Sequence, residues 1–210
     1  MQHDRSSLAA LIGSRICHDL INPIGAISNG LELAGMAGMA PGGPELSLIQ
    51  QSCDNATARI RFFRIAFGNA GDTYPIGAAE VQKTLADHYA GTRIMTSWPI
   101  TQSLGRDVTQ FGYLSVLCLE NALPQGGQIQ VTTEPGRLVT TAQADTVQTD
   151  GPYWTLLAKG AFSGDSSKLR PADVQFPLLA RLCKDDGIAI TVRSGQGWAS
   201  LTLDLSDRTG

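Results

Sequence analysis

Apolar residues repeat at alternating spacings of three and four through residues 46–67, and this repeat restricts the fold more than any other feature of the chain. A helix places residues at these spacings on one side, where they form a heptad seam that packs against another helix. Pro44 suits a first helical position and Gly68 suits a C-terminal stop, so we predict a helix between them. The seam comprises Leu46, Ile49, Cys53, Ala56, Ile60, Phe63 and Phe67.

An earlier segment carries a second apolar stripe. Its members are Leu20, Ile24, Ile27 and Leu31. At about 100° per residue they fall within roughly a 60° arc of one helix, in which Pro23 predicts a bend. Residues 35–43 are too rich in glycine to stay helical, so the two helices should form a hairpin. A hairpin alone leaves much apolar surface in water, and pairing of two copies into a four-helix bundle would bury it.

His18 lies on the side of the first helix opposite this stripe. The same side carries Arg15, Asn22, Gly25 and Asn29. These neighbours are polar or very small, so a large partner could approach the imidazole closely. A lone histidine is more often a core residue that is hydrogen-bonded to the backbone. In this helix, however, the side expected to be buried is already occupied by leucine and isoleucine. We therefore predict that His18 is exposed and reactive.

The residues around His18 suit nucleophilic chemistry. A neutral imidazole is a good nucleophile near neutral pH because its ordinary pKa is about 6.5. The Asp19 carboxylate could hold the proton of the other ring nitrogen and stabilise the positive charge that develops during attack. Asn22 could orient a water molecule or a phosphoryl oxygen, and Arg15 could neutralise phosphate charge or meet an acidic partner.

Residues 18–23, reading HDLINP, resemble the phosphoacceptor box of sensor histidine kinases, in which an acid follows the histidine and Thr or Asn precedes a proline. The longer stretch 14–33, reading SRICHDLINPIGAISNGLEL, more closely resembles bacterial histidine phosphotransferases of the ChpT family. So do residues 61–68, reading RFFRIAFG, and more loosely the remainder of the chain. This resemblance implies a homodimer that carries a phosphoryl group on His18.

The pattern becomes mixed after residue 69, which indicates a phosphotransfer hairpin at 1–70 and a second domain at 75–210. Glycine and proline separate the expected elements of that domain. Helices are expected at 76–89, 106–123 and 171–184, and strands at 93–98, 128–134, 138–144, 153–158, 188–193 and 198–205. We predict helices on one face of a mixed sheet, and an α+β fold for the whole chain.

The second domain resembles the ATP-binding domain of histidine kinases, with departures at the nucleotide site. Residues 119–123, reading LENAL, match the asparagine box of that family. Ala158 ends an expected strand where kinases place an aspartate that binds adenine. Residues 172–177, reading ADVQFP, replace glycines that let backbone amides approach phosphates. We therefore predict a kinase-like fold without ATP, and interpret Asn121 as a helix-end residue rather than a magnesium ligand.

Composition sets further bounds. A chain of 210 residues that is 42% hydrophobic fits one or two domains with a packed core. A net charge of -3 disfavours nucleic acid as the main partner. The scattered cysteines fit no metal site or compact disulfide framework, and no leader or membrane span is evident, so we expect a cytoplasmic protein that does not bind membranes. We interpret His88, at a helix end, as a solvated surface residue.

The resemblance implies a function in a two-component phosphorelay. The phosphoaspartate of a receiver domain would donate its phosphoryl group to His18, which would pass it to another response regulator. The donor would be a hybrid kinase similar to CckA, and the acceptors would be regulators similar to CtrA and CpdR. Gly25 and Asn29 would meet these partners. The chain would need no cofactor or metal of its own, because magnesium would reside on the receiver.

Two other functions remain open from the sequence. One is a sensor-type kinase that phosphorylates itself, which requires nucleotide binding. The other is a non-catalytic dimeric scaffold that binds response regulators and tolerates the loss of His18.

Overall fold

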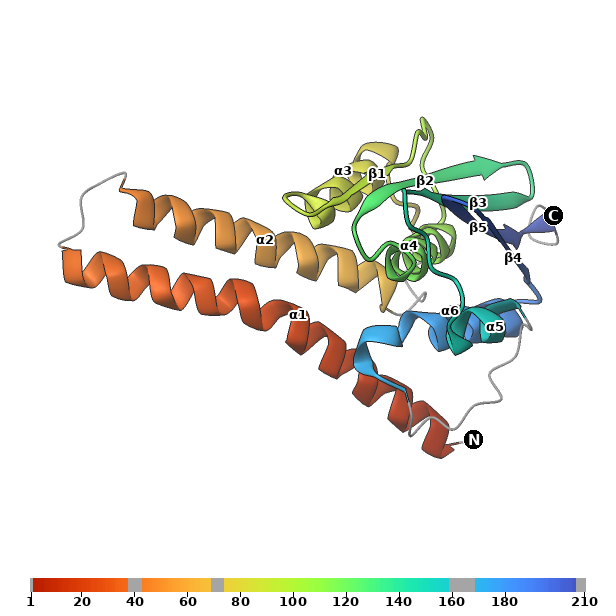
Figure 1. Cartoon of the computed structure of the whole chain (residues 1–210), viewed down its shortest axis with the longest axis horizontal. Coiled ribbons are helices and arrows are strands. Elements are labelled where there is room, and N and C mark those ends of the chain that lie inside the picture. Colours follow the sequence, from red (N-terminus) through yellow and green to blue (C-terminus); the bar gives the residue numbers. More distant parts are fainter. Residues whose placement is uncertain (1, 38–42, 69–73, 159–168, 207–210) are drawn as a thin grey trace.

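Two long helices and an α/β unit make up the computed structural model, which describes residues 2–37, 43–68, 74–158 and 169–206. Helix α1 (Gln2–Ala37) and helix α2 (Pro44–Ala66) lie side by side and run in opposite directions. Their far ends project away from the α/β unit (Figure 1). The predicted hairpin is confirmed, although α1 continues two residues beyond Gly35, and residues 38–42 lie outside the described part of the chain.

Both helices begin and end largely where their sequences indicate. Pro44 stands in the first turn of α2, and Phe67 follows its last residue. A side chain at Gly68 would collide with the backbone oxygen of Arg64, at 2.0 Å, so glycine suits the chain's departure from the helix. Helix α1 passes through Pro23 without interruption, which confirms one helix rather than two.

The predicted stripe of α1 is only partly covered within the chain. Ile24 and Leu31 are each 56% exposed, whereas Pro23, Gly30 and Ala34 are buried. Gly30 allows the close approach of α2, because a Cβ atom there would lie 2.6 Å from Cγ1 of Ile49. The expectation that the stripe itself faces the inside of the hairpin is therefore wrong for the single chain. Small residues beside the stripe make the contact with α2, Leu20 and Ile27 are half-buried, and Ile24 and Leu31 remain exposed.

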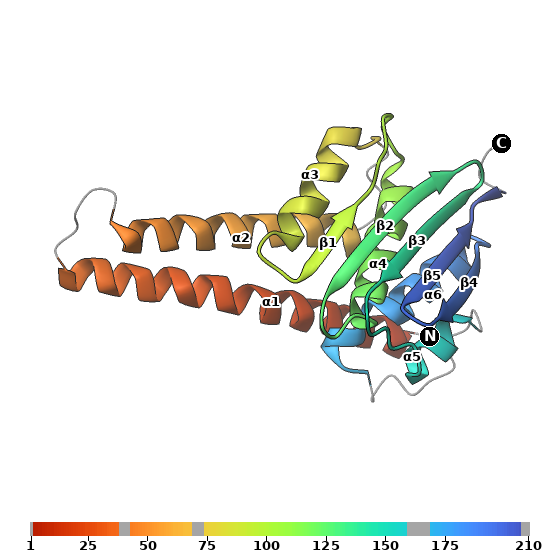
Figure 2. The same cartoon turned by 45° about the horizontal axis from the view of Figure 1, so that its top comes forward.

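The α/β unit has helices on one face of a five-stranded mixed sheet, as predicted (Figure 2). Its strands lie in the order β1-β2-β3-β5-β4, with β1 parallel to β2 and the other pairs antiparallel. The elements in chain order are α3 (Ala78–Tyr89), β1 (Ile94–Ser97), α4 (Arg106–Asn121), β2 (Gly127–Glu134), β3 (Arg137–Gln143), α5 (Pro152–Ala158), the 3-10 turn η2 (Pro171–Asp173), α6 (Gln175–Asp185), β4 (Ala189–Gly195) and β5 (Trp198–Asp204).

One predicted strand is wrong, because residues 153–158 form the short helix α5. Pro152 begins the helix, and the buried side chains of Trp154 and Leu157 lie three residues apart, which is a helical spacing. Trp154 packs edge-on against Phe176 of α6. Ala158 therefore ends a helix rather than a strand, so its comparison with the adenine-binding aspartate of kinases does not hold.

A single hydrophobic core joins the hairpin to the α/β unit. Phe62 and Phe63 of α2 belong to the same buried cluster as Leu85 of α3 and Leu114 of α4. Side chains near the start of α1, such as Ile12, pack against that cluster from another side. The proposed boundary between the two domains lies at residues 70–75, directly after the part of α2 that shares this core. Residues 69–73 lie outside the described ranges.

Candidate functional site

His18 projects into solvent from the middle of α1. Its side chain is 79% exposed. The neighbouring Cys17 is exposed as well, whereas Ile16 packs against the core from the other side of the helix. The prediction that the imidazole faces outward is confirmed, and no described residue needs to move for a partner to reach the ring.

The adjacent carboxylate orients the His18 ring. Nδ1 of His18 lies 3.1 Å from Oδ1 of Asp19, and the Asp19 side chain is only 13% exposed. A carboxylate accepts hydrogen bonds, so this contact favours the tautomer in which Nδ1 carries the proton. The lone pair of the neutral ring then lies on Nε2, the nitrogen that does not face Asp19. This arrangement leaves Nε2 available as the nucleophile.

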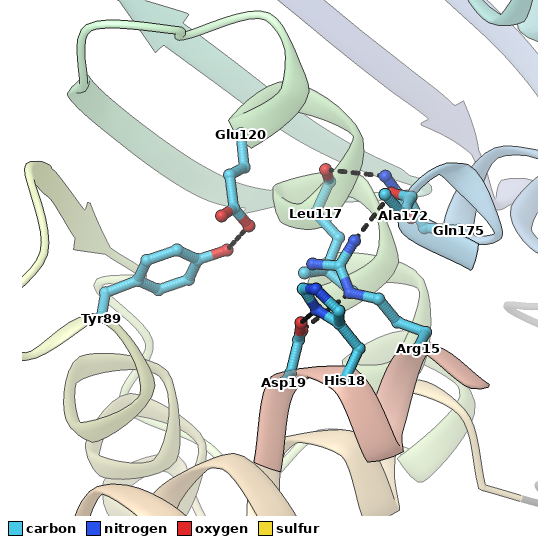
Figure 3. A network of polar contacts seen from close by, with 8 residues as sticks. All are labelled: Arg15, His18, Asp19, Tyr89, Leu117, Glu120, Ala172 and Gln175. Atoms are coloured by element: carbon cyan, nitrogen blue, oxygen red, sulfur yellow. Dashed lines mark hydrogen bonds and ion pairs between the residues drawn. The ribbon is translucent and has the colours of Figure 1, made fainter. Parts of the chain in front are cut away.

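Arg15 connects this pair to the α/β unit (Figure 3). Its Nε donates to Oδ2 of Asp19 at 2.7 Å, and its Nη1 donates to the backbone oxygen of Ala172 at 2.7 Å. The Arg15 side chain is 16% exposed. It therefore fixes the carboxylate that faces His18, a role the sequence did not reveal. Neutralisation of phosphate by Arg15 remains a prediction.

The other predicted site residues form an open surface next to His18. Asn22 and Asn29 are exposed on α1. A Cβ atom built on Gly25 would meet no atom within 4 Å, so packing within this chain does not require glycine there. Nothing in the described chain covers this side of the helix at Gly25, as expected of a surface that a partner approaches.

A polar pair that the sequence reasoning missed, made of the buried Tyr89 and the half-buried Glu120, lies across from Arg15 and Asp19 (Figure 3). The hydroxyl of Tyr89 donates to Oε2 of Glu120 at 2.8 Å. Burial raises the pKa of the Glu120 carboxyl, and the Tyr89 hydrogen bond and the charge of Arg15 partly oppose this shift. Burial, followed by the charge of Glu120, also raises the pKa of the Tyr89 hydroxyl. The available signal was an acid within the otherwise apolar end of α4.

His88 is buried, so its interpretation as a solvated residue is wrong. Its ring stacks on Phe62 with centroids 3.9 Å apart and an interplanar angle of 12°. Its Nδ1 has no hydrogen-bond partner within the described chain. Burial, followed by the charge of Arg59, lowers the pKa of His88 to about 3. Helix α3 turns this residue toward α2, whereas Lys83 and Asp87 pair on its outer side.

Asn121 is the last residue of α4, which confirms its interpretation as a helix-end residue. Its Nδ2 donates to Oδ1 of the fully buried Asp173 at 3.3 Å. Nε of Arg170 donates to the other carboxylate oxygen at 2.6 Å. Nε2 of Gln175 approaches the backbone oxygen of Leu117 at 3.5 Å. The segment that stands in place of the kinase glycines thus packs onto α4.

Within the described ranges, no three His, Cys, Asp or Glu side chains gather closely enough to hold a metal ion. The four cysteines form no disulfides with one another. None of the described helices combines the length and apolar character of a membrane span.

The comparison with protein families decides the assignment. Residues 78–197, more than half of the chain, match the model of the histidine phosphotransferase C-terminal domain. The chain belongs to the ChpT family of bacterial histidine phosphotransferases. That matched segment contains strands β1 to β4 and the helices that cover the sheet, together with Ala172 and Asp173 beside the His18 helix, whereas β5 follows it.

Individual relatives agree with this family assignment. The chain is 37% identical over 132 residues to the protein phosphotransferase ChpT of Brucella abortus (strain 2308), a match that covers 60% of this chain and 61% of that protein. The solved structure of a bacterial phosphotransferase is 29% identical, with a TM-score of 0.77, and the match covers 94% of this chain and 95% of that one.

Proposed function

We propose that this chain transfers phosphoryl groups between the aspartates of receiver domains in a two-component phosphorelay, through a covalent phospho-His18 intermediate. The observation that carries the proposal is the exposed imidazole whose Nδ1 faces Asp19. This geometry leaves Nε2 open to a visiting protein. The family assignment and the relative named as a protein phosphotransferase support the same chemistry.

The transfer occurs in two displacement steps. In the first, the Nε2 lone pair attacks the phosphorus of a receiver's aspartyl phosphate, the bond from phosphorus to the aspartyl oxygen breaks, and the donor carboxylate leaves. The Asp19 carboxylate stabilises the positive charge that forms on the His18 ring. In the second step an acceptor aspartate attacks phosphorus and neutral His18 is restored. Magnesium would be held by the receiver rather than by this chain, and would supply neutralisation of phosphoryl charge during each in-line transfer.

The proposed partners are receiver domains that dock around His18 in the cytoplasm. Following the family resemblance, the donor is the receiver of a CckA-like hybrid kinase, and the acceptors are CtrA-like and CpdR-like regulators. The exposed Asn22 and Asn29, with Gly25 between them, provide a surface on which a large partner can approach the ring.

The proposed assembly is a homodimer in which two hairpins form a four-helix bundle. Large apolar side chains are exposed along both helices, and such surface is usually covered by a partner. These residues are Ile21, Ile24, Leu31, Leu33, Leu48 and Ile60, with exposed fractions from 42% to 67%. A second copy offers a matching surface related by twofold symmetry.

Substitution of His18 tests the proposed transfer. The purified chain, incubated with a receiver domain carrying labelled phosphate and with Mg²⁺, should become labelled, whereas His18→Ala should not. Cys17→Ala changes the exposed neighbouring residue and should retain labelling. Label on the His18→Ala variant would disprove the proposal. Folding of both variants is checked by circular dichroism.

The self-phosphorylating kinase is tested with labelled ATP in the absence of any donor. Residues 172–177 pack onto α4 rather than leaving backbone amides open beside it, which supports the expectation that no label is incorporated. Incorporation that requires His18 would instead identify a kinase.

A further inference from the structure

We propose that Asp173 is a positioning residue for the chemistry of His18, although it lies on another element and does not touch the ring. It acts through Ala172, Arg15 and Asp19 in turn. The inference rests on the proposed function, and it assigns the α/β unit a role in setting which nitrogen of His18 carries the proton.

A series of polar contacts runs from His18 to Ala172, the residue that precedes Asp173 in the chain (Figure 3). Oδ1 of Asp19 faces Nδ1 of His18, and Oδ2 of the same carboxylate accepts from Nε of Arg15. The other end of that guanidinium donates to the backbone oxygen of Ala172. Ala172 directly precedes Asp173 within the η2 turn. The series therefore passes from the phosphoacceptor helix into the α/β unit.

The Asp173 carboxylate holds this turn in place. It is fully buried, and a buried carboxylate is costly unless charge-assisted hydrogen bonds compensate it. Arg170 supplies one such bond at 2.6 Å from the residue before the turn, and Asn121 supplies a contact at 3.3 Å from the end of α4. The backbone N–H of Asp173 also donates to the oxygen of Arg170 at 3.0 Å. These contacts fix the peptide whose oxygen faces Arg15.

The consequence for His18 follows from the freedom of the arginine side chain. A long arginine loses much rotamer freedom when both ends of its guanidinium are bound. With the Ala172 oxygen fixed, Arg15 holds Asp19 so that one carboxylate oxygen remains directed at Nδ1. In metal sites and in hydrolases, a carboxylate that accepts the N–H of one histidine ring nitrogen likewise fixes the tautomer of the ring. Loss of the anchor frees Arg15, and Asp19 can then turn away from the ring.

The first measurement is the tautomer of His18, which requires no receiver. Two-bond ¹H–¹⁵N correlation spectra at about pH 8.5, where an ordinary histidine is neutral, distinguish a protonated Nδ1 from a protonated Nε2. We expect the wild-type ring to be mainly protonated at Nδ1, and Asp173→Asn to give a mixture of both tautomers. Asp204→Asn, the same change at an exposed site on β5, should leave the wild-type spectrum.

The second measurement is phosphoryl transfer from a labelled receiver. We expect Asp173→Asn to lower the transfer rate at saturating receiver roughly tenfold, as for a contact that orients a reacting group. The receiver concentration that gives half the maximal rate should stay within about twofold of the wild-type value, because Asp173 is buried and does not form the docking surface.

A double-mutant cycle separates positioning from general destabilisation. If Asp173 acts through Arg15, the Arg15→Gln variant should gain no further tautomer mixing or rate loss when Asp173→Asn is added. Additive effects would overturn the proposal, as would a wild-type tautomer in Asp173→Asn. Should that variant fail to fold, Asn121→Ala decides the matter, because it loosens the same turn from an exposed position. If the wild-type chain accepts no label, the proposed function is refuted. The role of Asp173 in setting the His18 tautomer is then still tested by the NMR comparison of the wild type and Asp173→Asn.

Discussion

His18 and His88 show how the same residue type acquires opposite environments. Each stands beside an aspartate in the sequence, and each lies on an amphipathic helix. His18 is exposed with its ring on Asp19, whereas His88 is stacked on Phe62 and has lost contact with water. Helical spacing predicted the exposure of His18 correctly, although the apolar stripe on which that prediction relied is itself partly exposed in the single chain. The burial of His88 depends on α2, which packs against α3 from far away in the sequence.

The buried His88 makes stability depend on pH. Its folded-state pKa of about 3 lies below the ordinary value, so the unfolded chain binds more protons between these pH values. This contribution lowers the free energy of unfolding as the pH falls from about 6.5 toward 3. We predict that the free energy of unfolding of His88→Phe falls by about 2 kcal/mol less than that of the wild type when the pH is lowered from 7 to 5. Urea titrations at both pH values provide the measurement, and equal losses in variant and wild type would contradict it.

At the scale of elements, long periodic segments were predicted well and short apolar ones were not. The seam of α2 and the helix α4 were located to within a few residues, because many apolar positions repeat over several turns. Residues 153–158 contain too few apolar positions to distinguish a strand from a helix. They form the helix α5, which packs against α6 through Trp154 and Phe176. Helix α2 also has a second buried surface at Phe62 that its heptad seam does not include.

A close contact between α4 and the segment after β1 gives a prediction for an element. A Cβ atom at Gly112 would lie 2.2 Å from the buried ring of Trp98. We expect Gly112→Ala to lower the free energy of unfolding by about 1–3 kcal/mol, because the indole must shift within a packed core. Gly13→Ala is the matched control in α1, where nothing lies within 4 Å, and alanine should stabilise that helix by up to about 1 kcal/mol. Denaturant titrations compare the two, and equal effects would refute the packing argument.

At the scale of the whole molecule, the hairpin has one end set in the α/β core and the other projecting into solvent (Figure 1). The contact of Arg15 with Ala172 adds a polar link where α1 passes the unit. The large apolar residues of the projecting part stay exposed in one copy. The molecule therefore presents the exposed His18 between the α/β unit and the exposed apolar side chains of the hairpin.

Self-association through this surface is directly testable. We expect the wild-type chain to sediment as a dimer, and the double variant Ile24→Glu, Leu31→Glu to sediment as a folded monomer, because paired carboxylates would be buried in the bundle without partners. Tyr74→Glu places the same charge at a position that is 83% exposed and outside the hairpin, and should leave the dimer intact. A double variant that still dimerises would exclude this stripe as the interface.

Local sequence patterns were enough to predict the hairpin, the mixed sheet with helices on one face, and the exposure of His18, because the spacing of apolar residues and a short motif are local properties of the chain. The partners of Arg15, the burial of His88, the Tyr89–Glu120 hydrogen bond and the helical state of residues 153–158 instead depend on three-dimensional packing. Each of these depends on groups distant in sequence that come together in the fold. Hydrogen bonding and desolvation act on the atoms that are adjacent in space, so no local pattern could specify them.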